Sequence, residues 1–324
     1  MNYELNYFSV YVIKNFVPLQ KIHVDKYKCM NKIFSGTGVA MVTPFKQDFS
    51  VDIDKIDVLV NYLIDNGINY IVALGTTSET PTLSFKERKQ VLNTIIESVK
   101  GRIPIIAGIG SNNLAEIYEQ FHLFDLSKVS AVLSVTPYYN RPQQRGLIAH
   151  YEAVAEKSPL PVILYNVPAR TGVNIDAAST LHLAKKCPKI IGIKEASCNI
   201  IQIMNIIQHK PKDFLVISGD DAITLPLIAC GADGVISTTA NAFPKDFSTM
   251  VRLALDGNYS LAKEYHYKLL PCISACFQDG NPSGVKLFLK EKGLIEDYVR
   301  LPLVAVNEET KKVILELNRG YNGN

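Results

Sequence analysis

The sequence predicts an α/β fold: a (β/α)8 TIM barrel followed by a small all-helical extension at the C-terminus. Eight short apolar runs, rich in β-branched residues, recur from residue 36 onward, and segments with helical spacing lie between them. Each strand–helix unit is about 20–35 residues long, the size of a βα repeat. Strands this apolar are typical of a parallel sheet that helices cover on both faces. Eight units and no G-x-G-x-x-G sequence after the first run favour a barrel over an open dinucleotide-binding sheet.

The predicted elements follow in order along the chain. The expected strands are the apolar runs at 38–44, 70–75, 104–110, 131–137, 161–167, 190–196, 214–221 and 234–241. Helices are expected between them, for example at 54–66, 84–99, 113–126, 144–157 and 244–255. After residue 256 only helical spacing recurs, near 258–276, 282–292 and 307–319. We therefore assign 30–255 to the catalytic barrel and 256–324 to a C-terminal helical domain.

Composition and charge exclude several classes of protein. The formal net charge is only +3 over 324 residues, so nucleic acid is not an expected partner. The longest early apolar run, 7–13, is too short to cross a bilayer and follows no basic segment, so we predict no membrane association and a cytoplasmic location. Six scattered cysteines fit a reducing compartment. Residues 1–29 fall outside the repeat, and we interpret them as an N-terminal extension of unknown role that need not be ordered.

One cysteine pair raises the question of a metal site. Cys272 and Cys276 share a helix face at i,i+4 spacing, with His266 nearby. A zinc site needs about four such ligands, and no others suggest themselves. We favour core thiols, and we predict neither a metal nor a cofactor.

Lys194 ends the apolar run "IIGIKEA". Strand alternation places Ile190, Gly192 and Lys194 on one face, and we expect Gly192 to leave space for the lysine side chain. An apolar pocket favours the free amine, which can attack a ketone to form an iminium. From this run alone, a solvated strand end or a pair with Glu195 is equally well supported.

Other residues at predicted strand ends complete a pattern. Tyr165 closes the preceding strand, and because parallel neighbours lie about 4.8 Å apart, its phenol could serve the same substrate as Lys194. Thr76 and Thr77 in "GTTSET" offer a carboxylate-binding turn, and Arg170 in "PARTG" offers a second carboxylate contact. Taken separately, Tyr165 also fits a core aromatic, the Thr76–Thr77 turn also fits a helix cap, and Arg170 also fits an ordinary surface arginine. Together they indicate a Schiff-base lyase or aldolase that acts on a 2-keto acid.

At these residues the chain resembles the 4-hydroxy-tetrahydrodipicolinate synthase (dihydrodipicolinate synthase) family of the pyruvate-dependent class I aldolase superfamily. The resemblance runs from about residue 36 to the C-terminus. It rests on "GVAMVTPF", "GTTSE", "VTPYYNRP", "YNVPARTG", "IIGIKEA", "SGDD" and "GVISTTAN", in order and at similar spacing. The same superfamily contains N-acetylneuraminate lyases and 2-keto-3-deoxy sugar acid aldolases.

The resemblance implies the catalytic roles. Lys194 would form the Schiff base with pyruvate, and Tyr165 would be the proton donor and acceptor. Thr76 and Tyr139 would complete a proton relay, with Tyr139 supplied by a neighbouring subunit of a homotetramer.

The resemblance also implies the substrates. Thr77 and the backbone of Ile236 would hold the pyruvate carboxylate, and Arg170 would bind the carboxylate of L-aspartate 4-semialdehyde. The product would be 4-hydroxy-tetrahydrodipicolinate, on the route to diaminopimelate and lysine. Arg170 favours this reaction over the lyase and sugar-acid aldolase alternatives, which lack that arginine. A catalytically inactive barrel used as a binding protein is disfavoured, because every catalytic position holds a suitable residue.

A regulatory pocket for L-lysine is matched only in part. Asn112, Glu116 and Tyr138 match the family pocket, but Phe85 and Arg88 stand where lysine-inhibited members have histidines. Because Arg88 would bring like charge towards a lysine ligand, we predict weak or absent lysine feedback.

Overall fold

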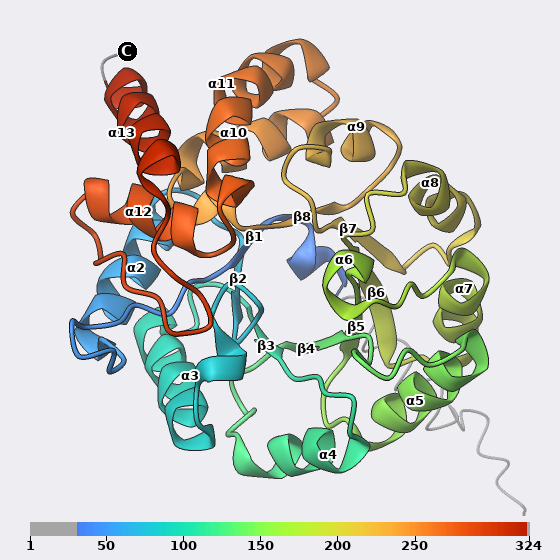
Figure 1. Ribbon diagram of the computed structural model, residues 1–324. Coiled ribbons are helices and arrows are strands. Elements are labelled where there is room, and N and C mark those ends of the chain that lie inside the picture. The colour runs from blue at the N-terminus through green and yellow to red at the C-terminus, as the bar shows by residue number, and fades with distance from the viewer. Residues whose placement is uncertain (1–30, 323–324) are drawn as a thin grey trace, which may run out of the picture.

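The computed structural model describes residues 31–322, and it is a closed barrel of eight parallel strands. The strands pair in chain order, and β8 pairs with β1 to complete the circle. Figure 1 shows the helices arranged around the strands. The predicted TIM barrel with C-terminal helices is confirmed, whereas the interpretation of 1–29 lies outside the described residues.

The strands are short and completely paired. They are β1 Gly36–Ala40, β2 Tyr70–Ala73, β3 Ile105–Gly108, β4 Ala131–Val135, β5 Val162–Asn166, β6 Ile190–Glu195, β7 Leu215–Ser218 and β8 Gly234–Ser237. The outer helices are α2 Ile53–Asp65, α3 Phe85–Val99, α4 Leu114–Leu123, α5 Gln144–Lys157, α7 Ala177–Lys186, α8 Ile200–His209, α9 Thr224–Ala229 and α10 Pro244–Leu255. Four single turns complete the barrel: η1 Asn31–Phe34 before β1, and η2 Thr80–Thr82, α6 Pro168–Thr171 and η3 Thr239–Asn241 in the segments after β2, β5 and β8.

Apolar side chains on both faces of the strands explain why the barrel forms. One cluster fills the barrel interior and includes Ile163, Ile217 and Ile236. Two further clusters lie between the strands and the surrounding helices. Burial on both faces is the arrangement that continuous Val- and Ile-rich runs predict.

Aromatic packing closes the amino-terminal end of the barrel. Tyr70 is fully buried, its hydroxyl donates to the Val235 carbonyl at 3.1 Å, and Phe34 packs edge-on against its ring. Gly38 is required there, because a Cβ at that position would lie 2.1 Å from the Tyr70 ring. With this end filled, the carboxyl end of the strands is left to form a site.

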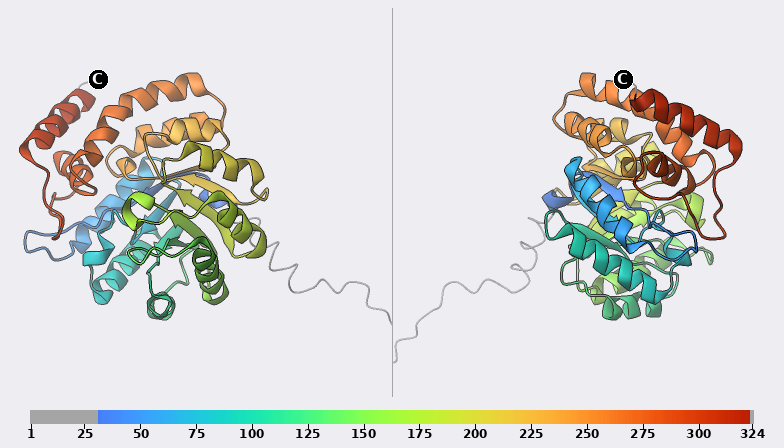
Figure 2. Two further views of the ribbon diagram at one scale, coloured as in Figure 1. Left: turned by 45° about the vertical axis from the view of Figure 1, so that its right-hand side comes forward. Right: turned by 90° about the vertical axis from the view of Figure 1, so that its left-hand side faces the viewer.

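The C-terminal segment forms three helices, α11 Tyr259–Gln278, α12 Ser283–Glu291 and α13 Glu308–Asn322. Figure 2 shows them gathered against one side of the barrel. Buried residues of α11 and α12, including Leu269, Val285 and Phe288, belong to the same hydrophobic cluster as buried residues of α2 and α10. The extension therefore shares its core with the barrel.

None of the helices within residues 31–322 combines the length and the apolar character needed to cross a bilayer.

Candidate active site

A β-bulge in β6 sets the direction of Lys194. The register against β5 shifts between Val162, which pairs with Ile190, and Ile163, which pairs with Gly192. Ile190 therefore packs outward among the helices, while Ile191 joins the barrel interior. The expectation that Ile190 and Lys194 share a face was wrong, because the bulge interrupts strict alternation.

Lys194 and Tyr165 stand side by side at the carboxyl ends of their strands. They are paired in register, and the Lys194 Nζ lies 4.4 Å from the centre of the Tyr165 ring. The two residues are only 6% and 7% exposed. The predicted proximity of amine and phenol is confirmed.

No ion pair neutralises the Lys194 amine among the described residues. Glu195, the alternative partner considered from sequence, is fully buried on the other side of the strand. Its carboxylate accepts hydrogen bonds from the side chains of Asn166 at 2.8 Å and Gln202 at 2.9 Å. Buried lysines without a carboxylate partner are uncommon, and their amines are candidates for chemistry.

The glycine that leaves room for Lys194 is Gly219. A Cβ at Gly219 would lie 3.0 Å from the Lys194 Cε and 2.8 Å from the Ala196 Cβ. A Cβ at Gly192 would instead meet Leu215 of the next strand, at 2.7 Å. The role predicted for Gly192 was therefore wrong, because that glycine admits a neighbouring strand and Gly219 admits the lysine.

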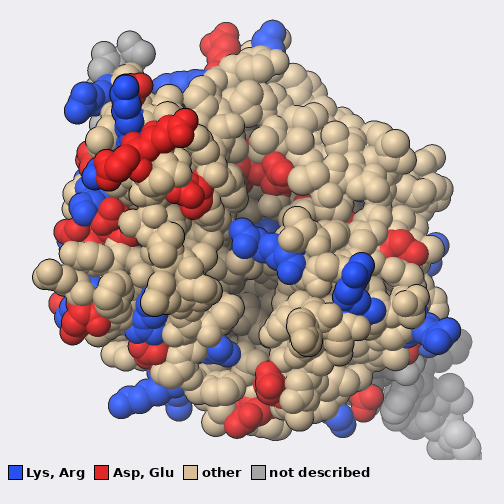
Figure 3. All heavy atoms as spheres, viewed as in Figure 1, with Lys and Arg blue, Asp and Glu red and all other residues tan. Residues whose placement is uncertain are grey.

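A cavity of about 370 Å³ opens at the same end of the barrel. Its lining includes Thr76, Tyr165 and Arg170, three of the predicted site residues. Arg170 lies on α6, is exposed, and has no carboxylate partner among the described residues. Figure 3 shows basic side chains beside a hollow near the middle of the molecule in this view. A phenol, a hydroxyl and a guanidinium thus line a space of substrate size, and the Lys194 amine is not in the cavity wall but lies against the Tyr165 ring.

Thr77 lies behind Thr76 and is almost completely buried. Its hydroxyl is 3.2 Å from the Thr238 hydroxyl at the end of β8, and it accepts a hydrogen bond from the Asn281 amide at 3.1 Å. Ile236, two residues before Thr238, packs its side chain inside the barrel. The predicted carboxylate-binding turn therefore lies beside the end of β8, the strand that carries Ile236.

Asp221 in "SGDD" has a structural role. Its Oδ2 accepts hydrogen bonds from the backbone N–H groups of Thr238 at 3.2 Å and Thr239 at 2.8 Å. Burial raises the pKa of this carboxyl. Asp221 therefore fixes the turn after β8 on which Thr238 meets Thr77.

Tyr139 lies apart from this cavity. Its side chain is 89% exposed, and its backbone is left-handed with φ of 73°. Within one subunit, the structure does not bring Tyr139 to Lys194. Among residues 31–322, the Tyr139 backbone N–H donates to the Thr171 carbonyl at 3.4 Å, while its ring stays exposed.

The residues of the predicted regulatory pocket lie close together. Glu116 and Tyr138 line the same cavity, as does Arg88. The Asn112 amide donates to the Tyr138 carbonyl at 3.1 Å, although Asn112 itself does not line the cavity. Phe85 is exposed and packs beside the Arg88 guanidinium, whose carbon lies 5.2 Å from the ring centre.

The cysteine pair of α11 lies in the core. Cys272 and Cys276 are buried, and burial raises the pKa of the Cys272 thiol to about 11. Among residues 31–322, no group of three or more His, Cys, Asp or Glu side chains could hold a metal ion.

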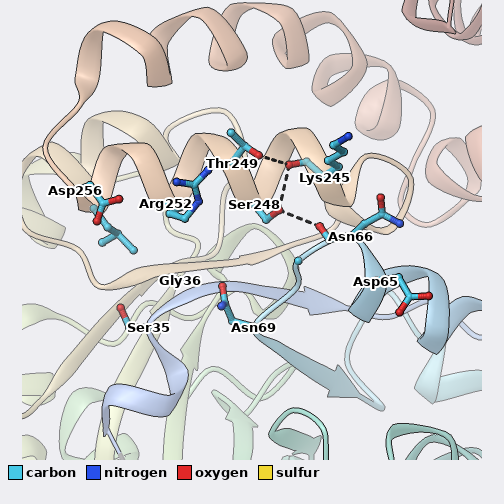
Figure 4. Close-up of a pocket in the computed structure, with 12 residues that line it drawn as sticks. Ser35, Gly36, Asp65, Asn66, Asn69, Lys245, Ser248, Thr249, Arg252 and Asp256 are labelled. Atoms are coloured by element: carbon cyan, nitrogen blue, oxygen red, sulfur yellow. Dashed lines mark hydrogen bonds between the residues drawn. The ribbon is translucent and has the colours of Figure 1, made fainter.

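A second hollow, of about 580 Å³, lies at the opposite end of the barrel. Figure 4 shows its polar side chains between α10 and the segments around Gly36 and Asn66. The Ser248 hydroxyl donates to the backbone carbonyls of Asn66 and Lys245, each at 3.1 Å. Because catalysis in such barrels occurs at the carboxyl ends of the strands, we assign this hollow no catalytic role.

Sequence reasoning missed four residues at the site: Gly219, Glu79, Asn281 and Lys286. The last two belong to the C-terminal segment, far from "GTTSET" in sequence. Lys286 precedes Lys290 by four residues on the same helix. Helical spacing alone does not distinguish Lys286, which is fully buried, from Lys290, which is exposed. An Asn-Pro pair before a helix likewise reads as an ordinary turn.

The fold and the site together define a (β/α)8-barrel enzyme with a buried lysine beside a tyrosine at its catalytic face. The family model described as the dihydrodipicolinate synthetase family matches residues 33–317. The chain therefore belongs to the dihydrodipicolinate synthetase family, as its sequence motifs indicated.

Named relatives agree with this assignment. The chain is 55% identical over 276 residues to a 4-hydroxy-tetrahydrodipicolinate synthase of Flavobacterium psychrophilum, covering 85% of this chain and 94% of the relative. A crystal structure of a dihydrodipicolinate synthase matches with a TM-score of 0.86 and 43% identity, over 89% of this chain and 99% of the other. The Acinetobacter baumannii enzyme, crystallised with pyruvate, matches with a TM-score of 0.86 and 40% identity over the same shares.

Proposed function

We propose that this enzyme condenses pyruvate with L-aspartate 4-semialdehyde to give 4-hydroxy-tetrahydrodipicolinate, in diaminopimelate and lysine biosynthesis. The observation that carries the proposal is the buried Lys194 amine, 4.4 Å from the Tyr165 ring centre and without a carboxylate partner among the described residues. Relatives named 4-hydroxy-tetrahydrodipicolinate synthase support the choice of substrates.

Lys194 supplies the covalent step. Its Nζ attacks the C2 carbonyl of pyruvate, and the carbonyl oxygen leaves as water, giving a protonated imine. Loss of a C3 proton gives an enamine, whose C3 attacks the aldehyde carbon of the second substrate. The amino group of that substrate then displaces Lys194 from C2 and closes the ring.

Proton transfer at each step falls to Tyr165. Its phenol is next to the amine, so it can donate a proton to the departing oxygen and accept the proton that leaves C3 of the imine. Thr76, on the cavity wall, and Tyr139, from a neighbouring subunit, extend the relay towards solvent. Such an arrangement requires an oligomer, and we propose a homotetramer.

The two carboxylates bind at separate points. Thr77 and the backbone of Ile236 hold the carboxylate of pyruvate beside the end of β8. Arg170, exposed at the rim and unpaired among the described residues, holds the carboxylate of the second substrate in bidentate fashion.

We also propose that the enzyme acts in the cytoplasm, where a biosynthetic enzyme of this family would meet its substrates.

Borohydride trapping tests the covalent step directly. Incubation with pyruvate and borohydride is expected to leave a reduced adduct on Lys194, located by mass spectrometry after digestion. Lys194→Ala should abolish the adduct and leave the fold intact, as measured by circular dichroism. Lys189→Ala is the matched control, because Lys189 binds the Ser158 carbonyl at 2.7 Å outside the barrel and should leave trapping unchanged.

Two outcomes would contradict the proposal. A wild-type protein that forms no adduct would favour a binding protein over an enzyme. A wild-type protein that forms the adduct but turns over N-acetylneuraminate in preference to L-aspartate 4-semialdehyde would instead place it among the lyases.

A further inference from the structure

A completely buried ion pair joins the C-terminal helices to the turn after β2. The Lys286 Nζ on α12 lies 2.6 Å from the Glu79 Oε1, and both side chains are fully buried. Removing two charges from water carries a desolvation cost that their attraction does not reliably offset. Stability alone is therefore a weak reason for this pair.

The C-terminal segment binds both oxygens of the Glu79 carboxylate. Oε1 accepts from Lys286, and Oε2 accepts from the Arg300 backbone N–H at 2.9 Å. Lys286 is held in turn by the Tyr298 carbonyl at 2.7 Å and by the Phe45 ring, 4.2 Å away. Glu79 therefore has one position that satisfies all of its partners.

Glu79 is also the last residue of the turn that carries Thr76 and Thr77. Its backbone is left-handed, with φ of 56°, and its N–H donates to the Thr76 carbonyl at 3.0 Å. A residue other than glycine adopts this conformation at a cost, so the side-chain contacts of Glu79 help to impose it.

A second contact from the same segment reaches Thr77. The Asn281 amide donates to the Thr77 hydroxyl at 3.1 Å, next to Thr238. Because an amide N–H only donates, Thr77 accepts from Asn281, and its own proton can be donated to Thr238 or to a ligand. The C-terminal segment thus contacts the carboxylate-binding turn at two places.

We propose that Lys286 and Glu79 are positioning residues for the carboxylate of the keto-acid substrate: their ion pair holds the turn on which Thr76 and Thr77 meet it. This inference rests on the proposed function. It gives the C-terminal helices a part in substrate binding, through a pair that touches no substrate.

The test is Lys286→Met, which keeps the length of the side chain and removes its charge. The KM for pyruvate is expected to rise about tenfold with a smaller change in kcat, because a displaced turn weakens binding. The pyruvate concentration that half-saturates borohydride trapping should rise by the same factor, independently of the second substrate. The matched control is Lys290→Met, one helical turn later, whose partner Asp297 lies at 2.7 Å on the surface.

A second variant guards against misfolding. Glu79→Gln retains the shape of the side chain, and it should also raise the half-saturating concentration. Because the two residues act together, Glu79→Gln combined with Lys286→Met should raise it by less than the product of the single effects. Folded variants with a lower melting temperature but unchanged half-saturation would overturn the inference. Failure of the wild type to form an adduct would instead refute the proposed function.

Discussion

Packing positions the Lys194 side chain at the scale of single residues. The Tyr165 ring lies on one side, and Gly219 leaves space for the lysine Cε on another. Packing contacts therefore hold Lys194 in place of a hydrogen-bonded carboxylate, because Glu195 is bound on the opposite side of the strand.

The positive charge of Arg88 is the reason to expect weak feedback inhibition by L-lysine. Its side chain lines the cavity beside Glu116 and Tyr138, and its Nε donates to the Leu83 carbonyl at 3.0 Å. Burial lowers the pKa of Arg88, opposed by Tyr138 and Glu116, but an arginine stays charged at physiological pH. We expect L-lysine to inhibit the wild type weakly or not at all, because its ammonium would meet this charge.

Initial rates measured over a range of lysine concentrations check this prediction. Arg88→Ala removes the like charge and should make inhibition stronger than in the wild type, while Lys89→Ala on the solvent side of the same helix should not. Inhibition of the wild type by submillimolar lysine would contradict it.

Strands and helices were predictable because their signals are local. All eight strands overlap the apolar runs, and the capping box formed by Ser84 and Glu87 at the start of α3 is an equally local feature. The bulge in β6 was not predictable, because it depends on how β6 pairs with β5. Likewise, Lys194 and Tyr165 come from adjacent strands and could be paired from the repeat, whereas Glu79 and Lys286 meet across 207 residues.

The start of α3 gives a pH-dependent prediction. The Arg300 guanidinium binds the Glu87 carboxylate through Nη2 at 2.5 Å and Nη1 at 3.1 Å. This hydrogen bonding, reinforced by Ser84, lowers the pKa of Glu87 from 4.5 to about 2. The unfolded chain therefore binds more protons between these values, so the stabilisation is complete above about pH 4.5 and lost as the pH falls towards 2.

Melting temperatures of Glu87→Gln and the wild type measure this effect. The variant should melt lower at pH 7, and the gap should narrow steadily between pH 4.5 and pH 2.5 as the wild-type carboxylate gains its proton. Glu97→Gln, on the exposed side of the same helix, should show no such gap. A gap for Glu87→Gln that is equal at both ends of the range would argue against the ion pair as its source.

Considered as a whole molecule, one chain leaves its proposed relay incomplete. Tyr139 is 89% exposed and lines no part of the cavity that Thr76 and Tyr165 share. If Tyr139 serves the site of a neighbouring subunit, two different inactive subunits should restore activity when mixed. The restored activity can be calculated, because under this hypothesis each subunit of a two-fold pair would give its Tyr139 to the other.

The mixing experiment pairs Tyr139→Phe with Lys194→Ala, each nearly inactive alone. After the subunits are dissociated and reassembled in equal amounts, hybrid pairs contain one site with both Lys194 and Tyr139. With random reassembly, about one quarter of wild-type activity should return, since about half of the pairs are hybrids with one intact site in two. Tyr165→Phe mixed with Lys194→Ala is the control, because both residues belong to one subunit and no intact site can form. Activity no greater than the sum of the separate variants would show that Tyr139 does not act across the interface.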